Sequence, residues 1–264
     1  MRARIGVFAV RSAGAVEDAL LGRRCAVCRE PLYGRAHRPA GICRRCTRRL
    51  YNARIEDRER CELCGRTLIS ERMRCTSCRG IERSFLNNAS PFEYRNCGDL
   101  LIRACKVNAA RRSVRLAAEL LAPLIPRVEM LVPVPSRTKA TARRGFDPVQ
   151  VLVRHLSNRL GIPSAPLLVR SGGGSAQKKL GREARAENVR GRYTLNAHCV
   201  DRFMRESGRS GTGPLSEASS RPFIGVSICL VDDVYTTGAT AEECSRVLAN
   251  AGAGTLYVRT LAVD

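Results

Sequence analysis

The sequence predicts an α/β protein in which an open parallel sheet flanked by helices is preceded by a small cysteine-rich metal module. A buried apolar run over residues 225–231 ends on two carboxylates, Asp232 and Asp233, and a helix-forming segment follows at 241–251. At the other end of the chain, eight of the 13 cysteines fall into four Cys-x-x-Cys pairs. We therefore expect an N-terminal segment at 1–22, the metal module at 23–84 and the α/β domain at 91–264.

The four cysteine pairs are separated by 14, 14 and 10 residues, which suits short hairpins that bring two pairs together. Soft thiolates bind Zn²⁺ tightly, so we expect one or two structural zinc sites. Disulfides are the alternative, but residues 1–10 contain no signal-peptide core. Pairing in chain order is the first expectation, and an interleaved pairing stays open. The metal ligands are Cys25, Cys28, Cys43, Cys46, Cys61, Cys64, Cys75 and Cys78.

Between these ends, the pattern of apolar residues predicts the remaining elements in order. Helices are expected at 97–107, 111–125 and 149–160, and strands at 128–134, 165–169, 193–200 and 254–263. Residues 201–222 are rich in Ser, Gly and Arg, so we expect a disordered surface insertion there. No stretch approaches the roughly 20 apolar residues that span a bilayer. The sequence thus predicts a soluble, cytoplasmic protein without membrane insertion.

Residues 232–240 read Asp-Asp-Val-Tyr-Thr-Thr-Gly-Ala-Thr, which places acids, hydroxyls and a glycine between a strand and a helix. Ligands of open α/β sheets bind at the carboxyl ends of the strands, and a helix N-terminus attracts anions. No Gly-Lys-Ser/Thr follows, and no Gly-x-Gly-x-x-Gly occurs between a strand and a helix. These absences exclude a P-loop and a dinucleotide-binding fingerprint. A helix cap without a ligand is the simpler alternative.

Residues 228–240 resemble the phosphoribosyl diphosphate motif of type I phosphoribosyltransferases, in which four apolar residues, two acids and two variable positions precede Thr-Thr-Gly-x-Thr. The resemblance implies that Asp232 and Asp233 hold the ribose hydroxyls and help to place Mg²⁺. It further implies that the 5′-phosphate is wrapped by Thr236, Thr237, Gly238, Ala239 and Thr240. With the tandem cysteine pairs, most of the chain resembles the ComF-type competence and amidophosphoribosyltransferase-like proteins.

Two further segments match this family. Leu-Val-Pro-Val-Pro at 131–135 is followed by a cationic run and by Arg-Gly-Phe-Asp at 144–147, where the family has Arg-Gly-Phe-Asn-Gln. Residues 177–188 carry Gln, Arg, Arg and Asn at the family's positions, which implies a mobile loop over the active site. Displacement of pyrophosphate builds negative charge that fixed cations must meet. The candidates are Arg137, Lys139, Arg143 and Arg144, joined by Lys178, Lys179, Arg182 and Arg185 when the loop closes. The catalytic residues we expect are Asp232, Asp233, Lys178, Arg182 and Arg185.

The formal net charge of +22 is divided equally between the residues up to Ser90 and those after it, so polyanions should be attracted to both parts. Arginine supplies 42 of the 46 basic residues, a preference that base composition in the source genome also produces. Nucleic-acid binding therefore stays a hypothesis.

Three classes of function remain. The first is a phosphoribosyltransferase that binds phosphoribosyl diphosphate with Mg²⁺ and transfers the phosphoribosyl group to an unidentified acceptor. The second is a DNA-uptake factor whose basic zinc module binds single-stranded DNA and contacts the uptake machinery, with a regulatory or vestigial phosphoribosyl diphosphate site. A metal-stabilised scaffold is the third, and a homodimer stays open. Because only 24 residues follow Thr240, we expect any acceptor-binding hood to come from residues 92–107 and the zinc module.

Overall fold

The computed structural model describes residues 24–32, 41–55, 59–106, 111–136, 141–142, 144–171, 189–208 and 221–264. Its centre is a five-stranded sheet in which every pairing is parallel. The strand order is β1-β7-β6-β3, and β2 pairs with β7 beyond the end of β1. The strands are β1 (Asn88–Ala89), β2 (Phe92–Glu93), β3 (Met130–Pro133), β6 (Ile228–Tyr235) and β7 (Leu256–Val263).

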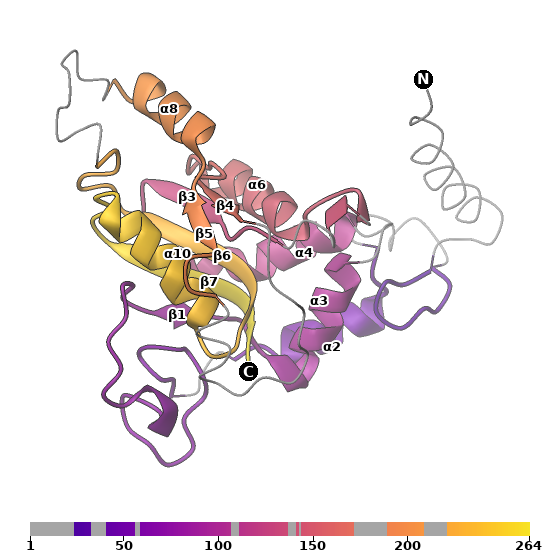
Figure 1. Ribbon diagram of the computed structural model, residues 1–264. Coiled ribbons are helices and arrows are strands. Elements are labelled where there is room, and N and C mark those ends of the chain that lie inside the picture. The colour runs from indigo at the N-terminus through magenta and orange to yellow at the C-terminus, as the bar shows by residue number, and fades with distance from the viewer. Residues whose placement is uncertain are drawn as a thin grey trace, which may run out of the picture.

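Helices cover both faces of this sheet, as Figure 1 shows. Helix α10 (Ala239–Asn250) lies on one face. The opposite face is covered by α3 (Asp99–Lys106), α4 (Arg111–Leu121) and α6 (Pro148–Leu160). The predicted α/β class with a parallel sheet is therefore confirmed, and the helices on both faces explain why β3 is buried along its whole length.

Successive side chains of β6 point to opposite faces of the sheet, and each face has its own layer of the hydrophobic core. Ile228 and Leu230 belong to the cluster that contains the α10 residues Cys244 and Leu248. Cys229 and Val231 belong to the other cluster, with α3, α4 and α6. Because successive strand residues point to opposite faces, the next two residues of β6, both acidic, are divided between the two faces.

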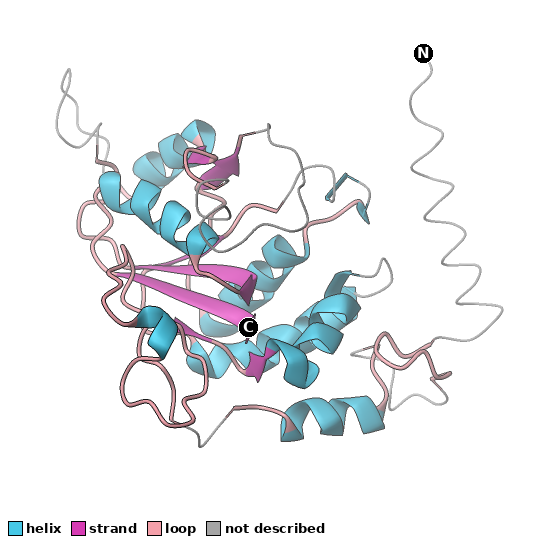
Figure 2. Ribbon diagram, turned by 60° about the horizontal axis from the view of Figure 1, so that its bottom comes forward, coloured by secondary structure: helices cyan, strands magenta, loops and turns pink. Residues whose placement is uncertain are grey.

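Each cysteine cluster packs on a different part of this core. The first cysteine group includes the start of α2 (Arg44–Asn52). Its Cys25 and Cys46 belong to the same hydrophobic core cluster as residues of α3 and α4. The second contains the short 3₁₀ helix Thr76–Cys78 and shares its cluster with β3 and β6. Gly65 allows this contact, because a Cβ there would lie 2.7 Å from the carbonyl oxygen of Asn88. In Figure 2 the secondary-structure colours separate the loop-rich second cluster from the helix of the first.

Several predicted boundaries are wrong. Strand β6 continues through the two acids to Tyr235, because it pairs with β7 up to Val263. Strands β4 (Leu168–Arg170) and β5 (Tyr193–Leu195) form a separate antiparallel ribbon.

After β5 the chain turns into α8 (Ala197–Glu206), whose first turn is capped by the side chain of Asn196. The predicted disordered insertion at 201–222 is thus helical in its first six residues, and residues 209–220 lie outside the described part. None of the helices described is long and apolar enough to cross a membrane.

Candidate functional site

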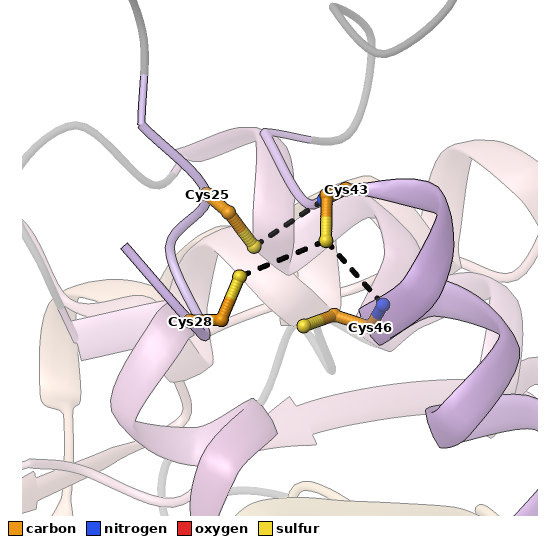
Figure 3. Close-up of side chains that lie close together, drawn as sticks. All are labelled: Cys25, Cys28, Cys43 and Cys46. Carbon is orange, nitrogen blue, oxygen red and sulfur yellow. Dashed lines mark hydrogen bonds between the residues drawn. The ribbon is translucent and has the colours of Figure 1, made fainter. Parts of the chain in front are cut away.

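The structure brings the eight predicted metal ligands together as two groups of four. Cys25, Cys28, Cys43 and Cys46 form one group, and Cys61, Cys64, Cys75 and Cys78 form the other. Within each group all four sulfur atoms lie within 4.8 Å of one another. Figure 3 shows the first group converging from the turn at 25–28 and the start of α2. The pairing follows chain order, and the interleaved alternative is excluded.

Both groups fit a tetrahedral Zn²⁺ ion. Four sulfurs at about 2.3 Å from one ion lie about 3.8 Å apart. The sulfurs of Cys28 and Cys43 are 3.7 Å apart, and so are those of Cys64 and Cys75. The free thiols titrate unequally. Burial raises the pKa of Cys61, but the backbone N–H groups of Cys64, Cys75 and Leu63 outweigh it and lower the value to about 7.

The pKa of Cys78 is raised to about 12 by burial and by the neighbouring Cys75 and Cys61. Four thiolates this close repel one another, and a divalent cation removes the repulsion. The donor set thus fits a structural zinc site in each group.

The two acids at the end of β6 face different neighbours. The backbone N–H of Asp233 donates to Asp232 Oδ1 over 2.8 Å, while Asp233 Oδ2 forms an ion pair with Lys106 Nζ at the end of α3. The pKa of Asp232 is raised well above its ordinary value by burial and by the charge of Asp233, and Lys106 opposes this shift. The acids are therefore a partly neutralised pair that a further cation can join.

The loop that follows β6, residues 236–238, carries two threonines and a glycine directly ahead of α10. Gly238 has φ +76°, and a Cβ there would lie 2.2 Å from the hydroxyl oxygen of Tyr235. Only glycine fits this position without displacing the ring. Helix α10 begins immediately afterwards, and its first N–H, that of Ala239, donates to Thr237 Oγ1 over 3.4 Å. The N–H groups of the first helical turn have no partner within the helix and face this loop. The loop and Asp232 line a cavity of about 30 Å³, together with Val258 and Thr260 of β7.

Sequence reasoning missed four residues around this loop. Arg83 and Ser84, just after the second cysteine group, hydrogen-bond to Thr237 and Glu242 respectively. Tyr193 of β5 forms a side-chain hydrogen bond with Thr240, and burial raises its pKa to about 12. Lys106, the fourth, pairs with Asp233. No spacing rule connects these residues with the motif, because they come from distant segments.

The predicted phosphate-binding cations are mostly outside the described residues. Seven of them lie there: Arg137, Lys139, Arg143, Lys178, Lys179, Arg182 and Arg185. Arg144 is described, and its buried Nε has no hydrogen-bond partner among the described residues.

Asp147, where the resembling family has Asn, caps α6. It accepts hydrogen bonds from the backbone N–H of Val149 and from Ser136 Oγ, both over 2.9 Å. Such a cap stabilises a helix by about 1 kcal/mol.

A second candidate surface follows α2. A groove of about 860 Å³ runs between this helix and the turn before α3. Its side chains are Arg44, Arg45, Arg48, Arg49, Asn52, Ala53, Asn96 and Cys97. Like charges at i and i+4 destabilise a helix, so the buried Cys46 and Leu50 on its other face must hold it in place. Nearby, the guanidinium of Arg54 lies 5.1 Å from the ring centre of Tyr51, which is 40% exposed.

Comparison with known proteins supports the zinc assignment. Residues 16–79 match the family described as "Double zinc ribbon domain". The N-terminal region is thus a cysteine-rich zinc ribbon region, as predicted. No curated protein matches the chain.

Among solved structures, the chain is similar to the glutamine phosphoribosylpyrophosphate amidotransferase from B. subtilis, with 17% identity and a TM-score of 0.33. The adenine phosphoribosyltransferase from Leishmania tarentolae shows 16% identity and a TM-score of 0.29. The alignments cover 55% and 58% of this chain, and 25% and 56% of those proteins respectively. The chain therefore spans between a quarter and about half of their lengths.

Proposed function

We propose that the chain binds phosphoribosyl diphosphate with Mg²⁺ and transfers the phosphoribosyl group to an acceptor, as the resemblance to ComF-type and amidophosphoribosyltransferase-like proteins implies. The observation that carries the proposal is the acid pair near the carboxyl end of β6, two residues before a hydroxyl-rich loop with Gly238 at positive φ and the N-terminus of α10. Carboxylates suit a hard divalent cation and ribose hydroxyls, whereas the loop suits a phosphate.

Each part of the site has a role in this chemistry. The loop N–H and hydroxyl groups hold the 5′-phosphate, and Asp232 and Asp233 orient the ribose. Mg²⁺, when bound, supplies positive charge to the pyrophosphate. The bond from ribose C1 to pyrophosphate breaks as a bond to the acceptor forms; pyrophosphate leaves with the electron pair, and the acceptor's proton passes to solvent water.

The test is calorimetric titration of the zinc-loaded protein with phosphoribosyl diphosphate and Mg²⁺. We compare the wild type with the Asp232→Asn, Asp233→Asn double variant. Removing two negative charges makes the field more favourable to an anion, so a loss of binding identifies specific contacts. Asp201→Asn, an exposed acid on α8, is the control. Unchanged affinity in the double variant would refute the proposed site.

A second function is favoured by the arginine groove of α2. We propose that it binds single-stranded nucleic acid, as the DNA-uptake hypothesis requires, with guanidinium groups on phosphates and Tyr51 available for stacking. The test is fluorescence anisotropy with a labelled oligonucleotide at several salt concentrations. Arg44→Ala with Arg48→Ala should reduce the salt slope by roughly 0.7 for each lost phosphate contact. Arg202→Ala with Arg205→Ala on α8 removes the same charge, and an equal loss there would refute a specific groove.

A further inference from the structure

Residues 79–87, here called the linker, join the second cysteine group to the sheet and contact the proposed phosphate loop. Arg83 Nη2 donates a hydrogen bond to the carbonyl oxygen of Thr237 over 3.0 Å. Ser84 donates from its backbone N–H and its hydroxyl to the carboxylate of Glu242, over 3.0 and 2.8 Å. Residues some 155 positions apart in the chain therefore meet at the loop and at the first turn of α10.

The contact of Arg83 fixes the direction of one loop N–H. In a trans peptide the carbonyl of one residue and the N–H of the next point in opposite directions. No peptide bond described is cis. A guanidinium that holds the Thr237 carbonyl on its own side therefore directs the Gly238 N–H away from that side. Gly238 is the N-cap residue of α10, so this N–H lies at the helix N-terminus that an anion would use.

The contact of Ser84 fixes the position of the Glu242 carboxylate. Glu242 lies in the first turn of α10, where the helix dipole favours a carboxylate. A carboxylate that is free to reach the helix N-terminus would compete with an anionic ligand for the same N–H groups. Two hydrogen bonds to Ser84 hold both carboxylate oxygens at the linker. The linker thus keeps the helix N-terminus available.

The linker is itself anchored to the second cysteine group. Phe85 packs edge-on against Tyr235 with ring centres 6.3 Å apart, and both rings share a buried cluster with Cys61, Cys64 and Cys78. The Nε of Arg83 is buried without a hydrogen-bond partner among the described residues. Burying a donor without a partner destabilises the folded state. A side chain that served only to fill space would not need this guanidinium.

We propose that Arg83 and Ser84 are positioning residues of the proposed phosphate loop. Arg83 orients the Thr237–Gly238 peptide, and Ser84 keeps the carboxylate of Glu242 away from the helix N-terminus. The inference rests on the proposed function for its ligand, the 5′-phosphate. The orientation of the loop in the free protein can be tested without that ligand.

The first experiment follows the amide resonance of Gly238 in the zinc-loaded, ¹⁵N-labelled full chain without ligand. Arg83→Ala should shift this resonance, and Arg83→Lys, which can still donate one hydrogen bond to the carbonyl, should return it most of the way. Arg72→Ala removes the same charge from an exposed position of the same module and should leave it unchanged. An unshifted Gly238 resonance in Arg83→Ala would overturn the role of Arg83.

The second experiment measures the affinity for phosphoribosyl diphosphate with Mg²⁺. Arg83→Ala should weaken binding roughly tenfold, the equivalent of about 1.4 kcal/mol. This loss should persist at ~0.5 M salt, where a purely long-range charge effect is largely screened.

Ser84→Ala should weaken binding severalfold, and adding Glu242→Gln should restore it, because the competing charge is then absent. A loss in Ser84→Ala that Glu242→Gln does not restore would refute the role of Ser84. No binding by the wild type would refute the proposed function, while the Gly238 resonance would still decide whether Arg83 orients the loop.

Discussion

Replacing Gly238 by alanine tests how closely Tyr235 packs against the proposed phosphate loop. At φ +76° the left-handed conformation costs an alanine about 1–2 kcal/mol of stability. Its Cβ would also lie 2.2 Å from the Tyr235 hydroxyl oxygen and 2.7 Å from Cζ, and such overpacking costs about 1–3 kcal/mol more. We therefore expect the free energy of unfolding to fall by about 2–5 kcal/mol, which lowers the Tm by roughly 5–15 °C.

A matched glycine separates the two costs. Gly161, after α6, has φ +69°, but a Cβ there would meet nothing within 4 Å. Gly161→Ala should therefore show the conformational cost alone. The assay is urea unfolding of the zinc-loaded variants, followed by circular dichroism. Tyr235→Phe removes the nearest atom and should recover part of the extra loss in Gly238→Ala, as a double-mutant cycle measures. Equal destabilisation by the two glycine variants would refute the close contact with Tyr235.

Three further predictions concern the metals and the acid pair. Cys64→Ser should lower the zinc content from two ions per chain to one, by colorimetric metal release, while Cys199→Ser should keep two; an unchanged count in Cys64→Ser would contradict the second site. Because burial and a neighbouring acid raise the pKa of Asp232, its ionised form accumulates only as the pH rises through that value. The affinity for phosphoribosyl diphosphate with Mg²⁺ should therefore increase with pH above the ordinary carboxyl range, and a calorimetric series that is flat with pH would argue against this role. Lys106→Met should strengthen Mn²⁺ binding severalfold by removing a competing cation from the acid pair, whereas Arg115→Met should not; weaker Mn²⁺ binding by Lys106→Met, in paramagnetic resonance titrations, would contradict the competition.

The parts of the fold that depend on local pattern were predictable from the sequence. The apolar run before Asp232 predicts β6, and the x-x spacing of the cysteines predicts both metal groups. The end of β6 was not predictable, because its last residues remain in the strand by pairing with β7 from the chain end. Nor was α8, since its helix follows from the Asn196 cap and a short apolar face amid a polar, Arg-rich sequence that resembles an insertion.

The site itself was predictable only where its residues are contiguous. The motif from Asp232 to Thr240 contains the acids and the loop in one run. Lys106 and Arg83 reach this run by tertiary packing alone, and nothing in their local sequence distinguishes them from the other basic residues. With 46 Lys and Arg residues in the chain, charge could not single them out. Their identification needed the ion pair with Asp233 and the hydrogen bond to Thr237.

The two cysteine groups support different halves of the proposed site. The first shares its hydrophobic cluster with α3, which ends in Lys106 at Asp233. The second shares its cluster with Tyr235 and is followed by Arg83 at Thr237. Because a structural zinc ion contributes folding free energy to the segment that binds it, we expect each metal to be coupled to a different part of the proposed site at the end of β6. This arrangement assigns the cysteine-rich region a role in shaping the site, beyond that of an appended module.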